Sequence, residues 1–163
     1  MKRTISALLL ALLTSAPTAF ADDSIAIGAR YGGEISENSS ISRNSDYYEA
    51  FADIYLNRLI SVGASISYLA SDISDAGSFT KQKSYPVTAL FKVHIPVPFL
   101  HPYAGLGQAI IFHNRKSTSG SPVAFAGADF SPLPGPLFLN LEYRHQFNEG
   151  DRSFIAGGIG VKF

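Results

Sequence analysis

The chain has 163 residues, and its 13 Lys and Arg balance its 13 Asp and Glu, so it shows no basic excess of the kind that nucleic acid attracts. It contains no cysteine, which excludes a disulfide framework, a thiolate metal site and a cysteine nucleophile. The length is sufficient for one domain with a core of its own.

The first 21 residues have the features of a secretory signal. Lys2 and Arg3 precede an apolar run from Ile5 to Leu13, and the small-residue pattern Ala19-Phe20-Ala21 follows. That apolar run is shorter than the roughly 20 residues that a helix needs to cross a bilayer. We therefore expect a signal peptide at 1–21 and one mature domain at 22–163, in which acidic residues slightly exceed basic ones.

Period-2 alternation between apolar and small or polar residues recurs from residue 25 to the last residue, without a sustained helical period. In the clearest segment, from Ile60 to Ser71, one face is aliphatic and the other is mostly serine and glycine. The alternation predicts strands near 25–32, 47–56, 60–71, 85–94, 137–147 and 155–163.

Two further strands, at Pro102–His113 and Val123–Phe130, alternate less clearly because glycine and alanine occur on both faces. We expect Tyr103, Gly105 and Gly107 to point inward. Pro86 lies inside a strand pattern, which argues against a central strand unless a bulge or the strand start accommodates it.

The connections between these strands alternate between two classes. The segments near 33–46, 71–83, 114–121 and 148–153 are long and polar, whereas those at 57–58, 95–100 and 131–136 are short or contain proline. Outer-membrane barrels have this pattern of short periplasmic turns and long extracellular loops. The sequence thus predicts an all-β fold, an eight-stranded antiparallel up-and-down transmembrane β-barrel.

The charged residues of the strands lie on the minor face of the alternation. We expect them to form a charge-paired interior network, whose members are Arg30, Glu49, Asp53, Lys92, Asp129, Glu142, Arg144 and Lys162. Glycine, alanine and serine share this face and suit the crowded interior of an eight-stranded barrel. The alternative is a soluble sandwich or barrel with the charged face outside, but such a surface is normally richer in Lys and Glu.

Two segments resemble parts of a known family. His101-Pro102-Tyr103-Ala104-Gly105-Leu106-Gly107 resembles the entry to a mid-barrel strand in small outer-membrane barrels of the OmpA, OmpX and OmpW type, and Leu141-Glu142-Tyr143-Arg144 resembles their penultimate strand. The resemblance extends over 22–163 and implies a location in the cell outer membrane. The final segment, Ile159 to Phe163, resembles the C-terminal signal that the outer-membrane assembly machinery selects, with Phe163 as its last residue.

Catalysis is the minority interpretation. His94, His101, His113 and His145 have no metal-ligand spacing, and we expect neither a metal nor a cofactor. His145 lies where outer-membrane lipid A deacylases have their catalytic histidine, but the position of their serine holds Phe147. Ser153 with Glu149 nearby is the remaining weak candidate for an activated nucleophile.

We expect a structural or surface-interaction role, with lipid and lipopolysaccharide as the surroundings and the four loops open to a surface ligand. The charges of the loops nearly balance, which indicates solvation more than adhesion; they are Glu34, Glu37, Asp46, Asp72, Asp75, Glu149 and Asp151 against Arg43, Lys81, Lys83, Arg115, Lys116 and Arg152. Transport of small apolar solutes, as in OmpW-like barrels, is the other alternative, although eight strands leave little lumen.

Overall fold

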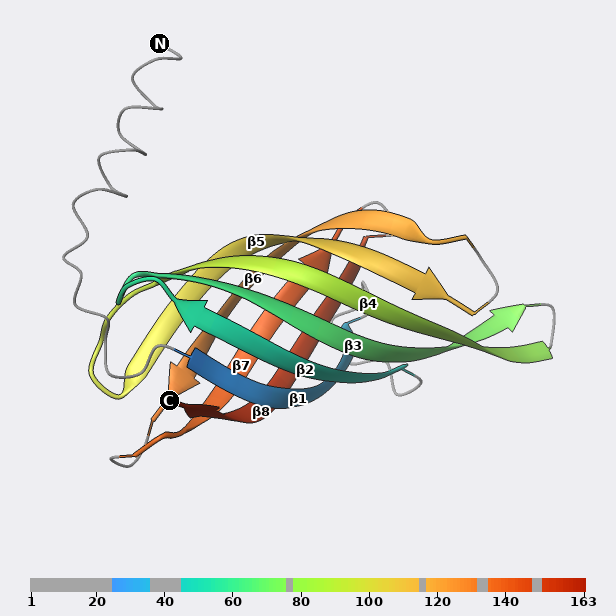
Figure 1. The fold of residues 1–163 in the computed structure, drawn as a ribbon. Helices are drawn as coiled ribbons and strands as arrows, with labels where there is room; N and C mark the ends of the chain where they lie inside the picture. Colours follow the sequence, from blue (N-terminus) through green and yellow to red (C-terminus); the bar gives the residue numbers. More distant parts are fainter. Residues whose placement is uncertain (1–24, 36–44, 76–77, 115–116, 132–134, 148–150) are drawn as a thin grey trace, which may run out of the picture.

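The computed structural model describes residues 25–35, 45–75, 78–114, 117–131, 135–147 and 151–163, with side chains left undescribed at 71–82. The predicted signal at 1–21 lies outside these ranges. Eight antiparallel strands close into one barrel in sequence order, with β1 paired to β8 (Figure 1). The strands are β1 Ile25–Ile35, β2 Ser45–Tyr55, β3 Ile60–Asp75, β4 Ser78–His94, β5 Leu100–His113, β6 Ser119–Phe130, β7 Leu137–Gln146 and β8 Arg152–Lys162. Among the described residues, no helix is long and apolar enough to span a membrane.

The register gives the inclination of the strands. From Ala29 on β1, paired residues run through Ala50, Ile66 and Val87 to Ile110 on β5. In the other direction they run through Ile159, Leu139 and Phe130 to Leu100, also on β5. The two rows therefore meet β5 at 110 and 100, a shift of 10 residues. Eight strands with this shift tilt by about 40° from the barrel axis.

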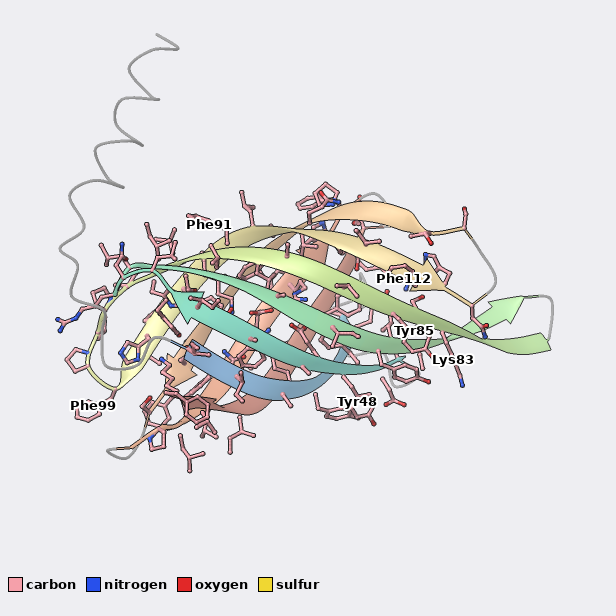
Figure 2. All side chains as sticks on the ribbon, in the orientation of Figure 1. Tyr48, Lys83, Tyr85, Phe91, Phe99 and Phe112 are labelled. Carbon is pink, nitrogen blue, oxygen red and sulfur yellow. The ribbon has the colours of Figure 1, made fainter. Side chains whose placement is uncertain are left out.

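The outward face of the barrel is apolar. Most of the large exposed side chains are aliphatic or aromatic, and Figure 2 shows Phe91, Phe99, Tyr85 and Phe112 pointing away from the barrel. On the inside, buried Arg, Lys, Asp, Glu and Ser alternate with these positions along the strands. For the described residues, the alternative in which the charged face lies outside is therefore wrong.

The predicted facing of strands one to four, seven and eight is confirmed by the burial of their side chains. On β5, Tyr103 is buried, and a side chain added at Gly105 would meet the ring of Phe125, so these two positions point inward. Phe125, Val123 and Asp129 are the buried positions of β6. The small residues that obscured the sequence pattern there, Ala124 and Ala126, lie on the outward face.

Several predicted loops are too long. The segment 71–83 was expected to be a loop, but β3 continues to Asp75 and β4 begins at Ser78, so that these two strands extend beyond their neighbours (Figure 1). β1, β6 and β8 likewise include residues that we assigned to loops. Backbone pairing continues where water surrounds both faces, whereas the alternation ends because neither face needs to be apolar. We call this end of the barrel the loop end and the opposite end the turn end.

Candidate functional site

The middle of the barrel holds a four-membered ionic cluster. Arg30 Nη1 lies 2.7 Å from Glu142 Oε1 and 3.3 Å from Glu49 Oε1. Arg144 Nη2 lies 2.9 Å from Glu49 Oε1 and 2.7 Å from Glu142 Oε1. Each arginine therefore contacts both carboxylates, and none of the four side chains is more than 6% exposed. Desolvation of this size is tolerable only where opposite charges alternate in this way.

The local sequence accounts for this meeting of charges. Arg30 on β1 and Glu49 on β2 are paired in the register. Glu142 and Arg144 are two residues apart on β7 and so project from the same face. The other four predicted residues form two separate pairs nearer the turn end, with Lys92 Nζ 2.7 Å from Asp53 Oδ2 and Lys162 Nζ 3.6 Å from Asp129 Oδ2. The structure thus places all eight residues inside, but in three groups.

Aromatic and amide groups complete the cluster, and sequence reasoning did not assign them to it. Tyr103 Oη donates a hydrogen bond to Glu142 Oε2 at 2.8 Å and accepts one from Asn140 Nδ2 at 2.8 Å. Tyr47 Oη donates to Glu49, and the Arg30 guanidinium lies 4.0 Å from the Phe51 ring centroid. The sequence pattern did place these residues near the cluster, because they lie on the same face of the alternation as the charged residues.

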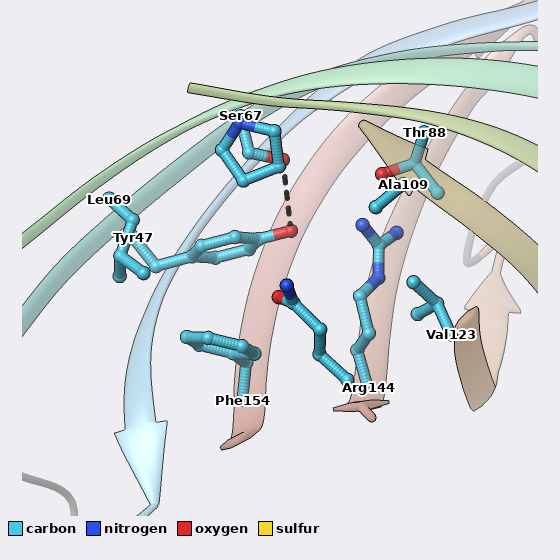
Figure 3. Close-up of a pocket in the computed structure, with 10 residues that line it drawn as sticks. Tyr47, Ser67, Leu69, Thr88, Ala109, Val123, Arg144 and Phe154 are labelled. Atoms are coloured by element: carbon cyan, nitrogen blue, oxygen red, sulfur yellow. Dashed lines mark hydrogen bonds between the residues drawn. The ribbon is translucent and has the colours of Figure 1, made fainter. Parts of the chain in front are cut away.

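A small cavity adjoins this cluster toward the loop end (Figure 3). Tyr47, Ser67, Thr88 and Arg144 are among its lining residues, and the tyrosine hydroxyl lies 3.3 Å from Ser67 Oγ. Its volume is about 10 Å³, roughly the space that one water molecule needs. This cavity is too small for an organic solute.

A second group of polar residues lies on the outward face near the loop end, on β7 and β8. His145 and Ser153 are paired in the register, with His145 Nδ1 3.0 Å from Ser153 Oγ. Tyr143 Oη lies 3.0 Å from the same oxygen, and the Phe147 ring stands 4.5 Å from the imidazole, edge to face. Glu149, the acid named with this pair, lies outside the described residues.

Among the other histidines, His113 lies between two serines, with its Nε2 3.3 Å from Ser119 Oγ. His94 Nε2 lies 2.8 Å from Ser61 Oγ inside the barrel, and His113 Nδ1 lies 3.1 Å from Ser84 Oγ. Nδ1 of His101 is buried without a hydrogen bond. In the described part of the chain, no three His, Cys, Asp or Glu side chains gather closely enough to hold a metal ion.

Phe163 closes the barrel at the turn end. Its N–H donates to the Ile25 carbonyl at 2.8 Å, and its carbonyl accepts from the Ile25 N–H at 3.1 Å. Its side chain is 59% exposed on the outward face. The residue that we named as the assembly signal thus presents an aromatic ring at the edge of the apolar band.

No protein-family model and no curated protein sequence matches the chain. Solved structures do match. The Yersinia pestis outer membrane protein Ail, in a phospholipid bilayer nanodisc, is 16% identical with a TM-score of 0.61, over 87% of this chain and 100% of Ail. Neisserial surface protein A is 18% identical with a TM-score of 0.61, over 88% of this chain and 98% of that one. Ail has also been crystallised in complex with the heparin analogue sucrose octasulfate.

A de novo designed transmembrane β-barrel is equally similar, with 17% identity and a TM-score of 0.59 over 88% of this chain and 98% of the design. These likenesses show the fold and no shared activity. The chain has the fold of the small eight-stranded outer-membrane barrels of Gram-negative bacteria, and the resemblance inferred from its sequence is confirmed at that level.

Proposed function

We propose that this chain is exported by its signal peptide and resides in the outer membrane, where it anchors its loops without catalysing a reaction. One observation carries the proposal: charged side chains are sealed and paired inside the barrel, while aliphatic and aromatic side chains cover its outside. Lipid favours this orientation because hydrocarbon solvates apolar side chains and not charged ones. Water would favour the reverse. Closure of the barrel also pairs the backbone groups of every strand, as lipid requires.

Fractionation of cells tests this location. The protein is expected in the outer-membrane fraction, without residues 1–21, and to migrate differently on a gel before and after boiling, because a folded barrel resists detergent until it is heated. Recovery of the folded mature chain from the periplasm would overturn the proposal. The assembly machinery is its expected partner during insertion, and deletion of Phe163 is expected to lower the amount that reaches the membrane.

The loops are the candidate sites for a surface ligand. The heparin analogue bound by Ail is a polyanion, but the loops of this chain carry nearly balanced charge, which does not favour a polyanion here. Shortening of the first two loops tests any adhesive role. Loss of cell binding with an intact barrel would support it, and unchanged binding would restrict the function to that of a structural membrane protein.

The packed interior argues against passage of solutes. The four-membered ionic cluster occupies the middle of the barrel, and the cavity beside it holds about 10 Å³. Planar-bilayer recording should therefore give no steady channels. Reproducible conductance steps would revive the transport alternative.

A second candidate function is hydrolysis of acyl esters of lipid A. The observation in its favour is the 3.0 Å contact between Ser153 Oγ and His145 Nδ1 on the face that lipid would cover. A histidine next to a serine is the arrangement that activates a nucleophile, but among the described residues no carboxylate contacts His145. Mass spectrometry of lipid A from cells with wild-type protein or the Ser153→Ala variant decides it: loss of an acyl chain only with wild type would establish the enzyme.

A further inference from the structure

The outward face carries hydrogen-bonding side chains near the loop end on both halves of the barrel, and on β1 to β4 these are Tyr31, Tyr48, Tyr68 and Tyr85. On β1 to β4, the described outward residues between the turn end and the tyrosines are all apolar; they are Ile25, Ile27, Ala29, Ala50, Ala52, Ile54, Ile60, Val62, Ala64, Ile66, Val87, Ala89, Phe91 and Val93. On β5, β7 and β8 the same face carries Gln108, His145 and Ser153. Polar groups directed at hydrocarbon are costly unless they find partners, so the hydrogen-bond partners of these three residues matter.

The register puts Gln108 and His145 at nearly the same height along the barrel axis. Paired rows climb toward the loop end as strand number rises, because the row from Ala29 reaches Ile110 in that direction. Gln108 pairs with Pro122, while Ala124, two residues nearer the turn end, pairs with His145. Two strand steps raise the height by about 6 Å and two residue steps lower it by about 5 Å, so Gln108 and His145 differ by only ~1 Å.

The group on β7 and β8 is held in place by its own hydrogen bonds. Ser153 Oγ lies 3.0 Å from Tyr143 Oη and 3.0 Å from His145 Nδ1. In the tautomer whose Nδ1 accepts from Ser153, the imidazole carries its proton on Nε2, for which the described residues provide no acceptor. The described residues thus give Nε2 of His145 no hydrogen-bond partner and leave it available to a group outside the protein.

Gln108 has the same requirement. Its side chain is exposed on the outward face, and its amide makes one long hydrogen bond, 3.3 Å, to the carbonyl of Ala109. An amide nitrogen carries two hydrogens, so at least one donor faces outward. Between Gln108 and His145 lies the outward face of β6, where Pro122, Ala124 and Ala126 rise little above the backbone.

We propose that Gln108 and His145 bind the acyl-chain carbonyl oxygens of lipid A in the outer leaflet, with the chains lying over β6. The amide of Gln108 offers a donor, and so does Nε2 of His145 in the tautomer whose Nδ1 accepts from Ser153. Ester or amide carbonyls are the acceptors that an acylated lipid brings to this depth. Gln108 on β5 and His145 on β7 are two strand spacings apart, or about 10 Å. That width suits the several carbonyls of one multiply acylated head group better than the two neighbouring carbonyls of a diacyl phospholipid. The inference rests on the proposed location in the outer membrane.

Native mass spectrometry of the refolded mature barrel tests the site. The protein is released from detergent micelles that contain either lipid A or phosphatidylethanolamine, and the retained lipid is counted. Wild type is expected to retain lipid A in preference to phosphatidylethanolamine. Gln108→Leu and His145→Phe each remove one hydrogen bond and should lower lipid A retention about tenfold. Tyr68→Phe, which removes a hydroxyl from the other half of the outward face, is the matched control and should retain lipid A like wild type.

Each outcome bears on the inference. Equal retention of the two lipids by wild type, or retention unchanged in both Gln108→Leu and His145→Phe, overturns it, and so does an equal loss in Tyr68→Phe. Heat-modifiable migration, recorded on every sample, reports failure of the barrel itself separately. The mass of the retained lipid A separates binding from hydrolysis, because an intact acyl count supports a binding site and a lost chain supports the enzyme.

Discussion

At the scale of single residues, the charges of the interior matter as a set. Arg30 and Arg144 each contact both Glu49 and Glu142, so removal of any one member leaves a buried charge without full compensation. At the loop end, Arg152 Nε lies 3.7 Å from Glu34 Oε1, but both side chains are about a quarter exposed. Water and salt screen such a pair, and it contributes little.

Glu142→Gln is expected to lower the free energy of unfolding by about 3–5 kcal/mol, because two buried guanidinium groups then share one carboxylate. Urea titration of the refolded barrel in lipid vesicles measures it. Glu34→Gln is the control and should cost less than ~1 kcal/mol. Equal effects of the two substitutions would mean that the interior is hydrated.

At the scale of single elements, glycine makes room for aromatic rings across the strands. Gly160 on β8 is paired with Phe138 on β7, and a Cβ at Gly160 would come within 2.6 Å of Phe138 Cε1. Both positions face inward, where eight strands leave little space. Phe138 is 2% exposed and fills the space that the glycine leaves.

Gly160→Ala should therefore destabilise the barrel by about 1–3 kcal/mol, as overpacking does. Phe138→Leu shortens the side chain that the new methyl group meets. In a double-mutant cycle measured by urea unfolding, the combined variant should lose less than the sum of the two single losses. Strict additivity would show that the ring does not contact this position.

The hairpin of β3 and β4 extends beyond the barrel wall. Pairing of β3 with β2 ends at Ser71, and pairing of β4 with β5 ends at Ser84, whereas β3 and β4 remain paired to Asp75 and Ser78. In the described part of the hairpin, residues 72–75 and 78–81 are thus paired only with each other.

Replacement of residues 72–81 by Asn-Gly, a two-residue turn that suits the Ser71–Gln82 pair, should leave the barrel folded. Its unfolding free energy is expected to stay within about 0.5 kcal/mol of wild type, because no barrel pairing is lost. Heat-modifiable migration and urea titration provide the readouts. A barrel that no longer folds would show that the hairpin takes part in closure.

At the scale of the whole molecule, the energetic cost of a charge on the apolar outward face depends on whether water or lipid surrounds the barrel. Leu106 is 67% exposed in the middle of the outward band on β5. In water an arginine at such an exposed position would cost little. Near the middle of a bilayer it would face hydrocarbon.

Leu106→Arg should therefore lower the unfolding free energy in phospholipid vesicles by about 2–4 kcal/mol. Ser117→Arg, exposed at the loop end, is the control and should cost ~0–1 kcal/mol. Comparable, small effects of both substitutions would contradict a membrane-spanning orientation.

Period-2 alternation by itself determined most of the strands and the inward face of Arg30, Glu49 and Lys92, because one face of every strand had to suit lipid. The length and polarity of the connections determined their order. Alternation did not predict where the strands end at the loop end of the barrel. Water on both faces there removes the need for alternation, while the backbone hydrogen bonds between strands continue. Pro86 illustrates a local exception: the β3–β4 pairing is interrupted beside it, between Ile66–Val87 and Leu69–Ser84, which accommodates its missing N–H.

Only the tertiary structure decided which charges meet. Arg144 and Glu49 are 95 residues apart in sequence, and closure of β1 onto β8 brings their strands to within reach across the interior. The division of eight charges into one cluster and two pairs depends on the ten-residue shift of the rows, and so does the common height of Gln108 and His145. Alternation assigns a side chain to a face, whereas register and closure set its height and its neighbours across the barrel.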